Sequence, residues 1–189
     1  MSTTDEVAAA IEAGEVVVIP TDTVYGLACR PDIEASVLAL SALKRRSPEQ
    51  PIALVASDID LLLELVPELA KTRLVTGAFT LVVPNPARRL PWLAGDTIGV
   101  RLPDVQGAAK ALLERVGVVA ATSANLHGGP DPRRIADVPG EILDGVAAVL
   151  DVGELPGTPS IVIDLTGPEP RVLREGAVPA AEALRRVGQ

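Results

Sequence analysis

Small polar residues and single cations follow several of the apolar runs in this sequence. Residues 21–23 (Thr-Asp-Thr) come directly after the β-branched run 16–19, and residues 123–125 (Ser-Ala-Asn) follow the apolar run 118–121. Arg101 stands at the end of another such run. Ligands of open α/β sheets bind at the carboxyl ends of strands, so these positions predict a binding site. The candidate set consists of hydroxyl, amide and cationic side chains: Thr21, Thr23, Lys44, Arg46, Arg101, Ser123, Asn125, Ser160 and Arg174.

Hydroxyl and guanidinium groups of this kind suit an anionic ligand such as a carboxylate or a phosphate. Three adjacent cations, residues 44–46, lie just before Pro48, which disfavours helix at the residue that precedes it. One or two of them are explained by a helix dipole, and small polar residues are also common in ordinary turns. A bound anion would relieve the repulsion among three cations, so the sequence favours a functional role for Lys44 and Arg46.

Several well-known catalytic motifs are absent from the sequence. There is no Gly-x-x-x-x-Gly-Lys phosphate loop, no Gly-x-Gly-x-x-Gly fingerprint and no Gly-x-Ser-x-Gly nucleophile elbow. His127 is the only histidine, which leaves little room for a Ser-His-Asp triad or a zinc site, and we expect it in an exposed loop. Phosphoryl and nucleotidyl transfers depend mainly on positioning and charge neutralisation, and the candidate set fits that chemistry.

The apolar patterns predict a single α/β domain with a twisted and mixed sheet. Thr3 and Glu6 form a capping-box pattern for the first helix, and Tyr25 and Gly26 are expected to turn the chain away after the first strand. Further helices are expected to start at Asp32, Asp58 and Asp104 and to cover residues 181–187. The expected strands cover residues 16–19, 51–56, 79–83, 97–101, 118–121, 146–151, 160–164 and 171–174.

Composition restricts the class of protein further. The chain has 189 residues, of which 48% are hydrophobic and 2% aromatic, which suits an aliphatic core but is poor for stacking nucleic-acid bases. The formal net charge of -8 also disfavours nucleic-acid binding. Cys29 is the only cysteine, so no disulfide framework is expected and a reducing compartment fits. We see no secretion signal and no apolar run near the roughly 20 residues of a membrane span, so a cytoplasmic protein is expected.

Seven short stretches resemble, in order, the landmarks of the YrdC family, the threonylcarbamoyl-AMP synthases. The first is Pro-Thr-Asp-Thr-Val-Tyr-Gly-Leu at residues 20–27. Lys-Arg-Arg at residues 44–46, with Pro51 after it, resembles the Lys-x-Arg segment of that family. Together the seven stretches cover nearly the whole chain. The other five are Phe-Thr-Leu-Val at 79–82, Val-Arg-Leu-Pro at 100–103, Ser-Ala-Asn at 123–125, Ser-Ile-Val-Ile-Asp at 160–164 and Leu-Arg-Glu-Gly at 173–176.

The resemblance implies one catalytic domain over residues 1–189, with a twisted open mixed sheet flanked by helices around a large cleft. The implied reaction joins L-threonine, bicarbonate and ATP into L-threonylcarbamoyladenylate and pyrophosphate. This product would feed the threonylcarbamoyladenosine (t6A) modification of tRNA through a separate threonylcarbamoyl transferase complex, so direct tRNA binding is expected to be weak or indirect. ATP is a substrate that Mg²⁺ is expected to accompany, and no membrane partner is expected. The chain resembles the short bacterial type, which lacks the extra C-terminal domain of the longer branch.

The same resemblance implies roles for individual residues. Lys44 and Arg46 would be the catalytic cations on the triphosphate, and Arg101 would take the carboxylate of threonine. The implied ATP-binding residues are Lys44, Arg46, Thr97, Ser123, Asn125 and Arg174. The implied threonine-binding residues are Thr21, Thr23, Arg101 and Ser160. No residue is assigned as a metal ligand.

The sequence also differs from the family pattern. Gln50 stands where Asn is common, Val55 where some members have His, residues 75–78 (Val-Thr-Gly-Ala) replace Trp-Pro-Gly-Pro, and residues 127–128 (His-Gly) replace Ser-Gly. Other functions therefore stay open: an RNA-binding or ribosome-maturation module of the same fold, a regulator without activity, and a carbamoyl-adenylate domain like that of hydrogenase maturation proteins. Those maturation proteins are normally much longer chains with zinc-finger and acylphosphatase parts.

Overall fold

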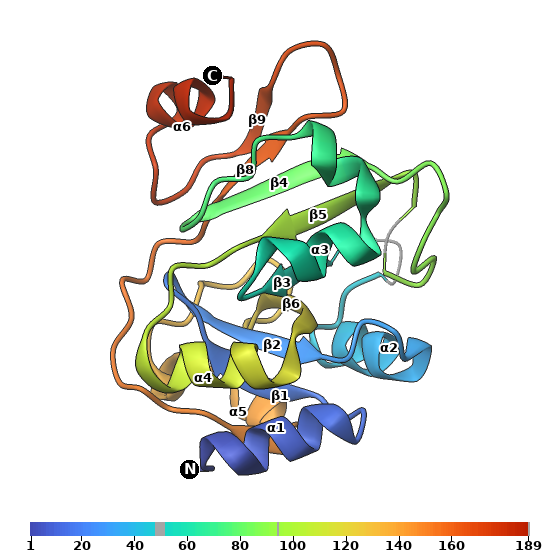
Figure 1. Cartoon of the computed structure of the whole chain (residues 1–189). Helices are drawn as coiled ribbons and strands as arrows, with labels where there is room; N and C mark the ends of the chain where they lie inside the picture. The colour runs from blue at the N-terminus through green and yellow to red at the C-terminus, as the bar shows by residue number, and fades with distance from the viewer. Residues whose placement is uncertain (48–51, 94, 189) are drawn as a thin grey trace.

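The computed structural model describes residues 1–47, 52–93 and 95–188. The sequence predictions at Pro48, Gln50 and Pro51 lie outside the described residues. Within this part, one mixed sheet of nine strands runs through the molecule in the order β7-β1-β2-β6-β3-β5-β4-β8-β9 (Figure 1). The predicted class, an α/β domain with a mixed open sheet, is therefore confirmed. The strands are β1 (Val17–Pro20), β2 (Tyr25–Cys29), β3 (Ala53–Ala56), β4 (Phe79–Pro84), β5 (Thr97–Arg101), β6 (Val118–Ser123), β7 (Ala148–Val149), β8 (Ile161–Asp164) and β9 (Arg171–Arg174).

Helices flank this sheet, and α1 and α6 lie at its opposite ends (Figure 1). In the part of the chain that the structure describes, none of them is long and apolar enough to cross a lipid bilayer. The α-helices are α1 (Thr4–Glu12), α2 (Glu34–Leu43), α3 (Ile59–Leu65), α4 (Gly107–Val116), α5 (Gly140–Leu143) and α6 (Ala180–Val187). The two 3-10 helices are η1 (Pro67–Lys71) and η2 (Ile135–Asp137).

Strands β1 and β2 form an antiparallel hairpin, which corrects the prediction that Tyr25 and Gly26 turn the chain away. Pro20 pairs with Tyr25, so the reversal lies in the four residues between them. Tyr25 is an aromatic residue with high strand propensity and is fully buried, which explains why it continues the sheet. Gly26 is needed for close approach, because a Cβ atom there would lie 3.0 Å from the carbonyl oxygen of Thr122.

Of the helix starts predicted at Thr3, Asp32, Asp58 and Asp104, two are confirmed and two are wrong. Thr3 and Glu6 form the reciprocal capping box of α1, and Asp58 accepts a hydrogen bond from the backbone of α3. Asp32 instead forms an ion pair with Arg30, and α2 begins after Ile33 without a side-chain cap. The backbone N–H of Asp104 donates to a distant carboxylate, and α4 begins only at Gly107.

The two faces of the sheet differ along β3, β4, β5 and β8. Residues such as Leu54, Leu81 and Val100 are buried in the larger hydrophobic core together with α3 and η1. The alternate residues point to the other face, since successive side chains of a strand alternate. Over β1, β2 and β6 this second face is covered by α1 and α4, which pack against each other (Figure 1). On β3, β4, β5 and β8, this second face of the sheet presents the small and polar residues of the candidate site.

Candidate active site

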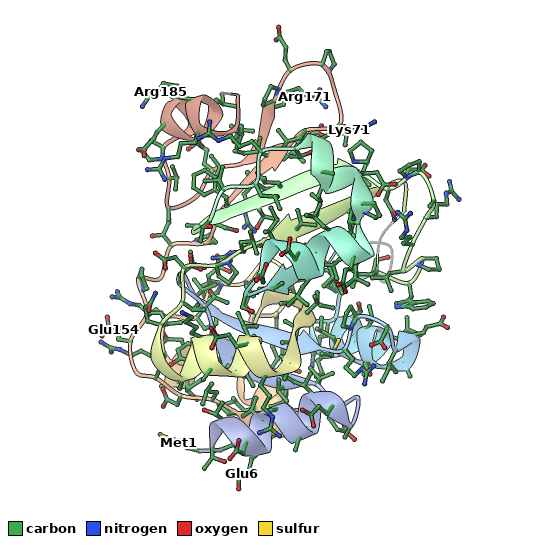
Figure 2. All side chains as sticks on the ribbon, in the orientation of Figure 1. Met1, Glu6, Lys71, Glu154, Arg171 and Arg185 are labelled. Atoms are coloured by element: carbon green, nitrogen blue, oxygen red, sulfur yellow. The ribbon has the colours of Figure 1, made fainter. Side chains whose placement is uncertain are left out.

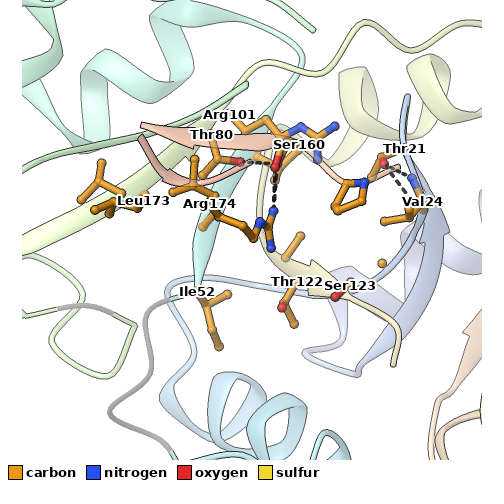
Figure 3. Close-up of a pocket in the computed structure, with 18 of the residues that line it drawn as sticks. Thr21, Val24, Ile52, Thr80, Arg101, Thr122, Ser123, Ser160, Leu173 and Arg174 are labelled. Atoms are coloured by element: carbon orange, nitrogen blue, oxygen red, sulfur yellow. Dashed lines mark hydrogen bonds between the residues drawn. The ribbon is translucent and has the colours of Figure 1, made fainter. Parts of the chain in front are cut away.

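A cavity of about 370 Å³ lies on this second face of the sheet, and its size is in the range of small-molecule sites. Alternate residues of β5, namely Thr97, Gly99 and Arg101, form part of its lining, as do Thr80 and Val82 of β4. Figure 3 shows its polar residues coming from separate segments of the chain, and aliphatic residues such as Ile52 and Leu173 also line the cavity. The lining residues are Thr21, Val24, Gly26, Ile52, Ala53, Val55, Thr80, Val82, Thr97, Gly99, Arg101, Ala121, Thr122, Ser123, Pro159, Ser160, Val162, Leu173 and Arg174.

The end of β5 brings Arg101 against the β1–β2 hairpin. Its Nη2 donates 2.9 Å to the Thr23 hydroxyl and also pairs with the carboxylate of Asp22. The Thr23 hydroxyl lies 3.0 Å from that of Thr21, whose hydroxyl donates to the carbonyl oxygen of Val24 at 2.7 Å. Burial lowers the pKa of Arg101, whereas the negative charge of Asp22 raises it. The result is a buried guanidinium held by one carboxylate and one hydroxyl.

A second polar cluster joins the ends of β4, β8 and β9. The hydroxyls of Thr80 and Ser160 lie 2.8 Å apart, and Arg174 Nη2 donates 2.8 Å to the Ser160 carbonyl oxygen, as Figure 3 shows. The register between β8 and β9 shifts next to Val162. This irregularity explains why two consecutive residues, Leu173 and Arg174, both line the cavity, although neighbours in a regular strand face opposite sides.

The third cluster surrounds Lys44, which directly follows α2 and is 4% exposed. Its ammonium donates to the carbonyl oxygen of Ser123 at 2.6 Å, to that of Asn125 at 2.8 Å and to the Asn125 side-chain oxygen at 2.7 Å. The Asn125 side-chain oxygen also accepts from the Ser123 hydroxyl at 2.7 Å. Burial and the nearby charge of Arg46 lower the pKa of Lys44 to about 8. Lys44 thus fixes the turn after β6 and places positive charge beside it.

Arg46 lies next to this cluster, where its Nη1 is 3.5 Å from the Thr122 hydroxyl on the cavity wall. Burial lowers the pKa of the Arg46 guanidinium. By contrast, Arg45 between the two cations is exposed and pairs with Glu141 on the molecular surface. The backbone of Arg45 has a φ of 52°, and this left-handed residue turns the chain so that its neighbours face inward.

The structure therefore brings the ten predicted site residues to one region. Six of them line the cavity: Thr21, Thr97, Arg101, Ser123, Ser160 and Arg174. The other four do not line it but contact a residue that does: Thr23, Lys44, Arg46 and Asn125. His127 is exposed in a loop, as predicted.

The candidate set of the sequence analysis left out three polar residues of this region. Thr80 and Thr122 line the cavity, and Asp22 pairs with Arg101. Thr80 was detectable in principle, because a hydroxyl within an apolar strand marks a face that is not packed in the core. The partner of Asp22 lies 79 residues away, and no local pattern indicates such a contact.

In this region, buried and exposed cationic side chains surround a small cavity whose lining is partly apolar and includes hydroxyl groups. Such a site can bind a carboxylate and phosphates together, since both ligands accept hydrogen bonds from guanidinium and hydroxyl groups. The charged side chains labelled in Figure 2, such as Glu6, Glu154 and Arg185, are instead exposed at the periphery of the molecule. In residues 1–47, 52–93 and 95–188, no three His, Cys, Asp or Glu side chains come together as a metal site would require.

Comparisons with known proteins identify the family of this chain. A family model for Sua5, YciO and YrdC proteins, described as "Telomere recombination", matches residues 9–176. A curated relative from Mycobacterium tuberculosis is 37% identical over 179 residues, which span 89% of this chain and 82% of the relative. The threonylcarbamoyl-AMP synthase of Stenotrophomonas maltophilia is 33% identical over 165 residues, which span 82% of this chain and 88% of that enzyme.

A solved structure extends the likeness to three dimensions. Sua5 of Pyrococcus abyssi, crystallised in complex with L-threonine, has 32% sequence identity and a TM-score of 0.85. The match covers 98% of this chain but 57% of that longer protein. From the family match over most of the chain and the identity to full-length relatives, we conclude that this chain belongs to the Sua5/YciO/YrdC family.

Proposed function

We propose that this protein is an L-threonylcarbamoyladenylate synthase, a nucleotidyltransferase that uses L-threonine, bicarbonate and ATP. The observation that carries the proposal is the cavity, which is lined by Arg101, Arg174 and several hydroxyl groups. Relatives in the same family are named threonylcarbamoyl-AMP synthase. A relative with the same fold was crystallised with L-threonine, which supports an amino-acid substrate. Both an amino-acid carboxylate and a triphosphate require cations, and the cavity and its surroundings provide four of them.

The threonine end of the site is proposed at Arg101. Its buried guanidinium would bind the carboxylate, because Nε and Nη1 have no hydrogen-bond partner among the described residues. Thr21, Thr23 and Ser160 supply hydroxyls around it, and those of Thr21 and Ser160 belong to residues of the cavity wall. We assign the recognition of threonine to these four residues.

The nucleotide end is proposed at the turn after β6. Lys44 and Arg46 bring two positive charges next to Ser123 and Asn125, and the triphosphate would bind beside them. Lys44 would exchange one of its three oxygen acceptors for a phosphate oxygen when ATP binds. Arg174 would complete this end, with Thr97 and the aliphatic residues of the cavity as walls for the nucleoside.

The chemistry proceeds in two steps. The amine of threonine combines with bicarbonate to form a carbamate, with loss of water. A carbamate oxygen then attacks the α-phosphorus of ATP, the bond from that phosphorus to the bridging oxygen breaks, and pyrophosphate leaves. Lys44 and Arg46 stabilise the negative charge that develops on the phosphate oxygens, which is the main task of a protein in such transfers.

Mg²⁺ is proposed to enter with ATP as part of the substrate, since few protein ligands are needed for a metal bound to phosphates. The product would pass to a separate threonylcarbamoyl transferase complex for tRNA modification in the cytoplasm. Direct contact with tRNA would be weak, because the formal net charge of the chain is -8.

Pyrophosphate release tests this proposal directly. The purified protein should release pyrophosphate from ATP only when threonine and bicarbonate are both present, and serine or valine should replace threonine poorly. Filter binding with tRNA over a range of salt concentrations provides the matched comparison. Tight tRNA binding without threonine-dependent pyrophosphate release would contradict an adenylate synthase and support an RNA-binding module.

A further inference from the structure

Asp22 is a nearly buried carboxylate that the reaction outlined above does not use. Its side chain is 10% exposed, and it does not line the cavity. One oxygen accepts from Arg101 Nη2, and the other accepts from the backbone N–H of Asp104 at 3.1 Å. The carboxylate therefore joins the β1–β2 turn, the end of β5 and the segment that leads into α4.

The position of Asp22 matters because Arg101 carries a charge in a poorly solvated place. The side chain of Arg101 is 9% exposed, and Arg174 adds a like charge nearby. A buried charge without a counterion is strongly unfavourable, so Asp22 supplies the compensation that keeps the guanidinium charged. It does so through Nη2 alone, which is shared with Thr23 and leaves Nε and Nη1 without partners among the described residues.

We propose that Asp22 is a positioning residue that fixes the orientation of Arg101 for the carboxylate of the amino-acid substrate. This inference rests on the proposed function. A guanidinium held at one nitrogen cannot rotate freely, so its remaining donors are set in advance and less freedom is lost on binding. Asp22 thereby acts on substrate affinity through Arg101 and makes no contact with the substrate itself.

The test uses Asp22→Asn in the full chain, with Asp164→Asn as the matched control. Asp164 is also 10% exposed and also pairs with an arginine, Arg171, at the far end of β8. Asp22→Asn should raise the KM for threonine about tenfold or more, while the KM for ATP stays within about twofold. Asp164→Asn should lower thermal stability and leave both KM values unchanged. A threonine KM for Asp22→Asn equal to that of the wild type would overturn the proposal.

A double variant separates positioning from a merely structural effect. If Asp22 acts through Arg101, then Asp22→Asn combined with Arg101→Ala should have the same threonine KM as Arg101→Ala alone, within about twofold. Effects that multiply would overturn the proposal. Should Asp22→Asn fail to fold, Asp22→Glu decides, because it keeps the charge and displaces the carboxylate; an unchanged threonine KM for it would likewise overturn the proposal.

Measurements on the wild type separate failure of the proposed function from failure of the proposed role of Asp22. Absence of threonine-dependent pyrophosphate release from the wild type would contradict the proposed function itself. An active wild type beside an unaffected Asp22→Asn would contradict only the role of Asp22.

Discussion

Replacement of Lys44 by methionine should lower the rate of pyrophosphate release at least about tenfold while the protein still folds. Methionine is similar in length to lysine but carries no charge. Lys44 is 4% exposed, and its ammonium donates to three oxygens, of which two are the backbone carbonyl oxygens of Ser123 and Asn125. The variant therefore separates the contribution of the charge to catalysis from the contribution of the side chain to folding.

Two opposing effects on stability are of similar size. Lowering of the Lys44 pKa from 10.5 to about 8 corresponds to roughly 3 kcal/mol against the buried charge at pH 7, since one pKa unit is worth about 1.4 kcal/mol. Without the ammonium, the carbonyl oxygens of Ser123 and Asn125 lose a hydrogen-bond donor, which costs about 1–3 kcal/mol for each oxygen. The two effects then differ by at most about 3 kcal/mol, which urea denaturation measures as the change in the free energy of unfolding.

For catalysis, no second effect offsets the loss of the positive charge of Lys44. The charge next to the reacting phosphates is lost, so kcat for pyrophosphate release should fall at least about tenfold. Lys110→Met, on the exposed face of α4, is the matched control and should change neither quantity. A Lys44→Met protein that is folded and turns over at the wild-type rate would refute the assignment of Lys44 to the site.

Three further predictions concern the same cavity. Arg46→Ala should lower pyrophosphate release at least about tenfold, whereas Arg45→Ala, which removes an exposed surface cation, should not; equal rates for the two variants would contradict the assignment. Gly176→Ala should destabilise the protein by roughly 1–3 kcal/mol or more and raise the threonine KM, because a Cβ there overlaps the backbone of Ser160. A variant with the thermal stability and the threonine KM of the wild type would contradict this prediction. The kcat/KM for ATP should fall as the pH rises through about 8, because Lys44 loses its proton there, and a pH profile that Lys44→Met leaves unchanged would exclude this cause.

Local features of the sequence predicted most of the elements that carry the site. The β-branched and apolar runs before Arg101 and before Ser123 form strands β5 and β6, and both residues lie at the strand ends where they were expected. These predictions succeeded because the alternation of side chains and the burial of aliphatic residues are properties of short segments. Glycine was less informative, since Gly26 serves close strand packing and not the turn that was predicted for it.

Contacts between distant segments could not be predicted in this way. The ion pair of Asp22 with Arg101 joins residues 79 positions apart, and the bond from Asp104 to Asp22 takes Asp104 away from the helix start expected for it. The register shift beside Val162 also depends on the pairing of two strands and turns both Leu173 and Arg174 toward the cavity. Sequence order alone does not determine which strands pair, and these details arise only from that pairing.

The most direct test of the central claim follows the carbon of bicarbonate into the product. The protein is incubated with ATP, threonine and bicarbonate labelled with a heavy carbon isotope, and the products are analysed by mass spectrometry. We expect one adduct that contains AMP, threonine and one labelled carbon, formed in equal amount with pyrophosphate and only when all three substrates are present. An adenylate of threonine without the label, or pyrophosphate release that does not need threonine, would contradict the account.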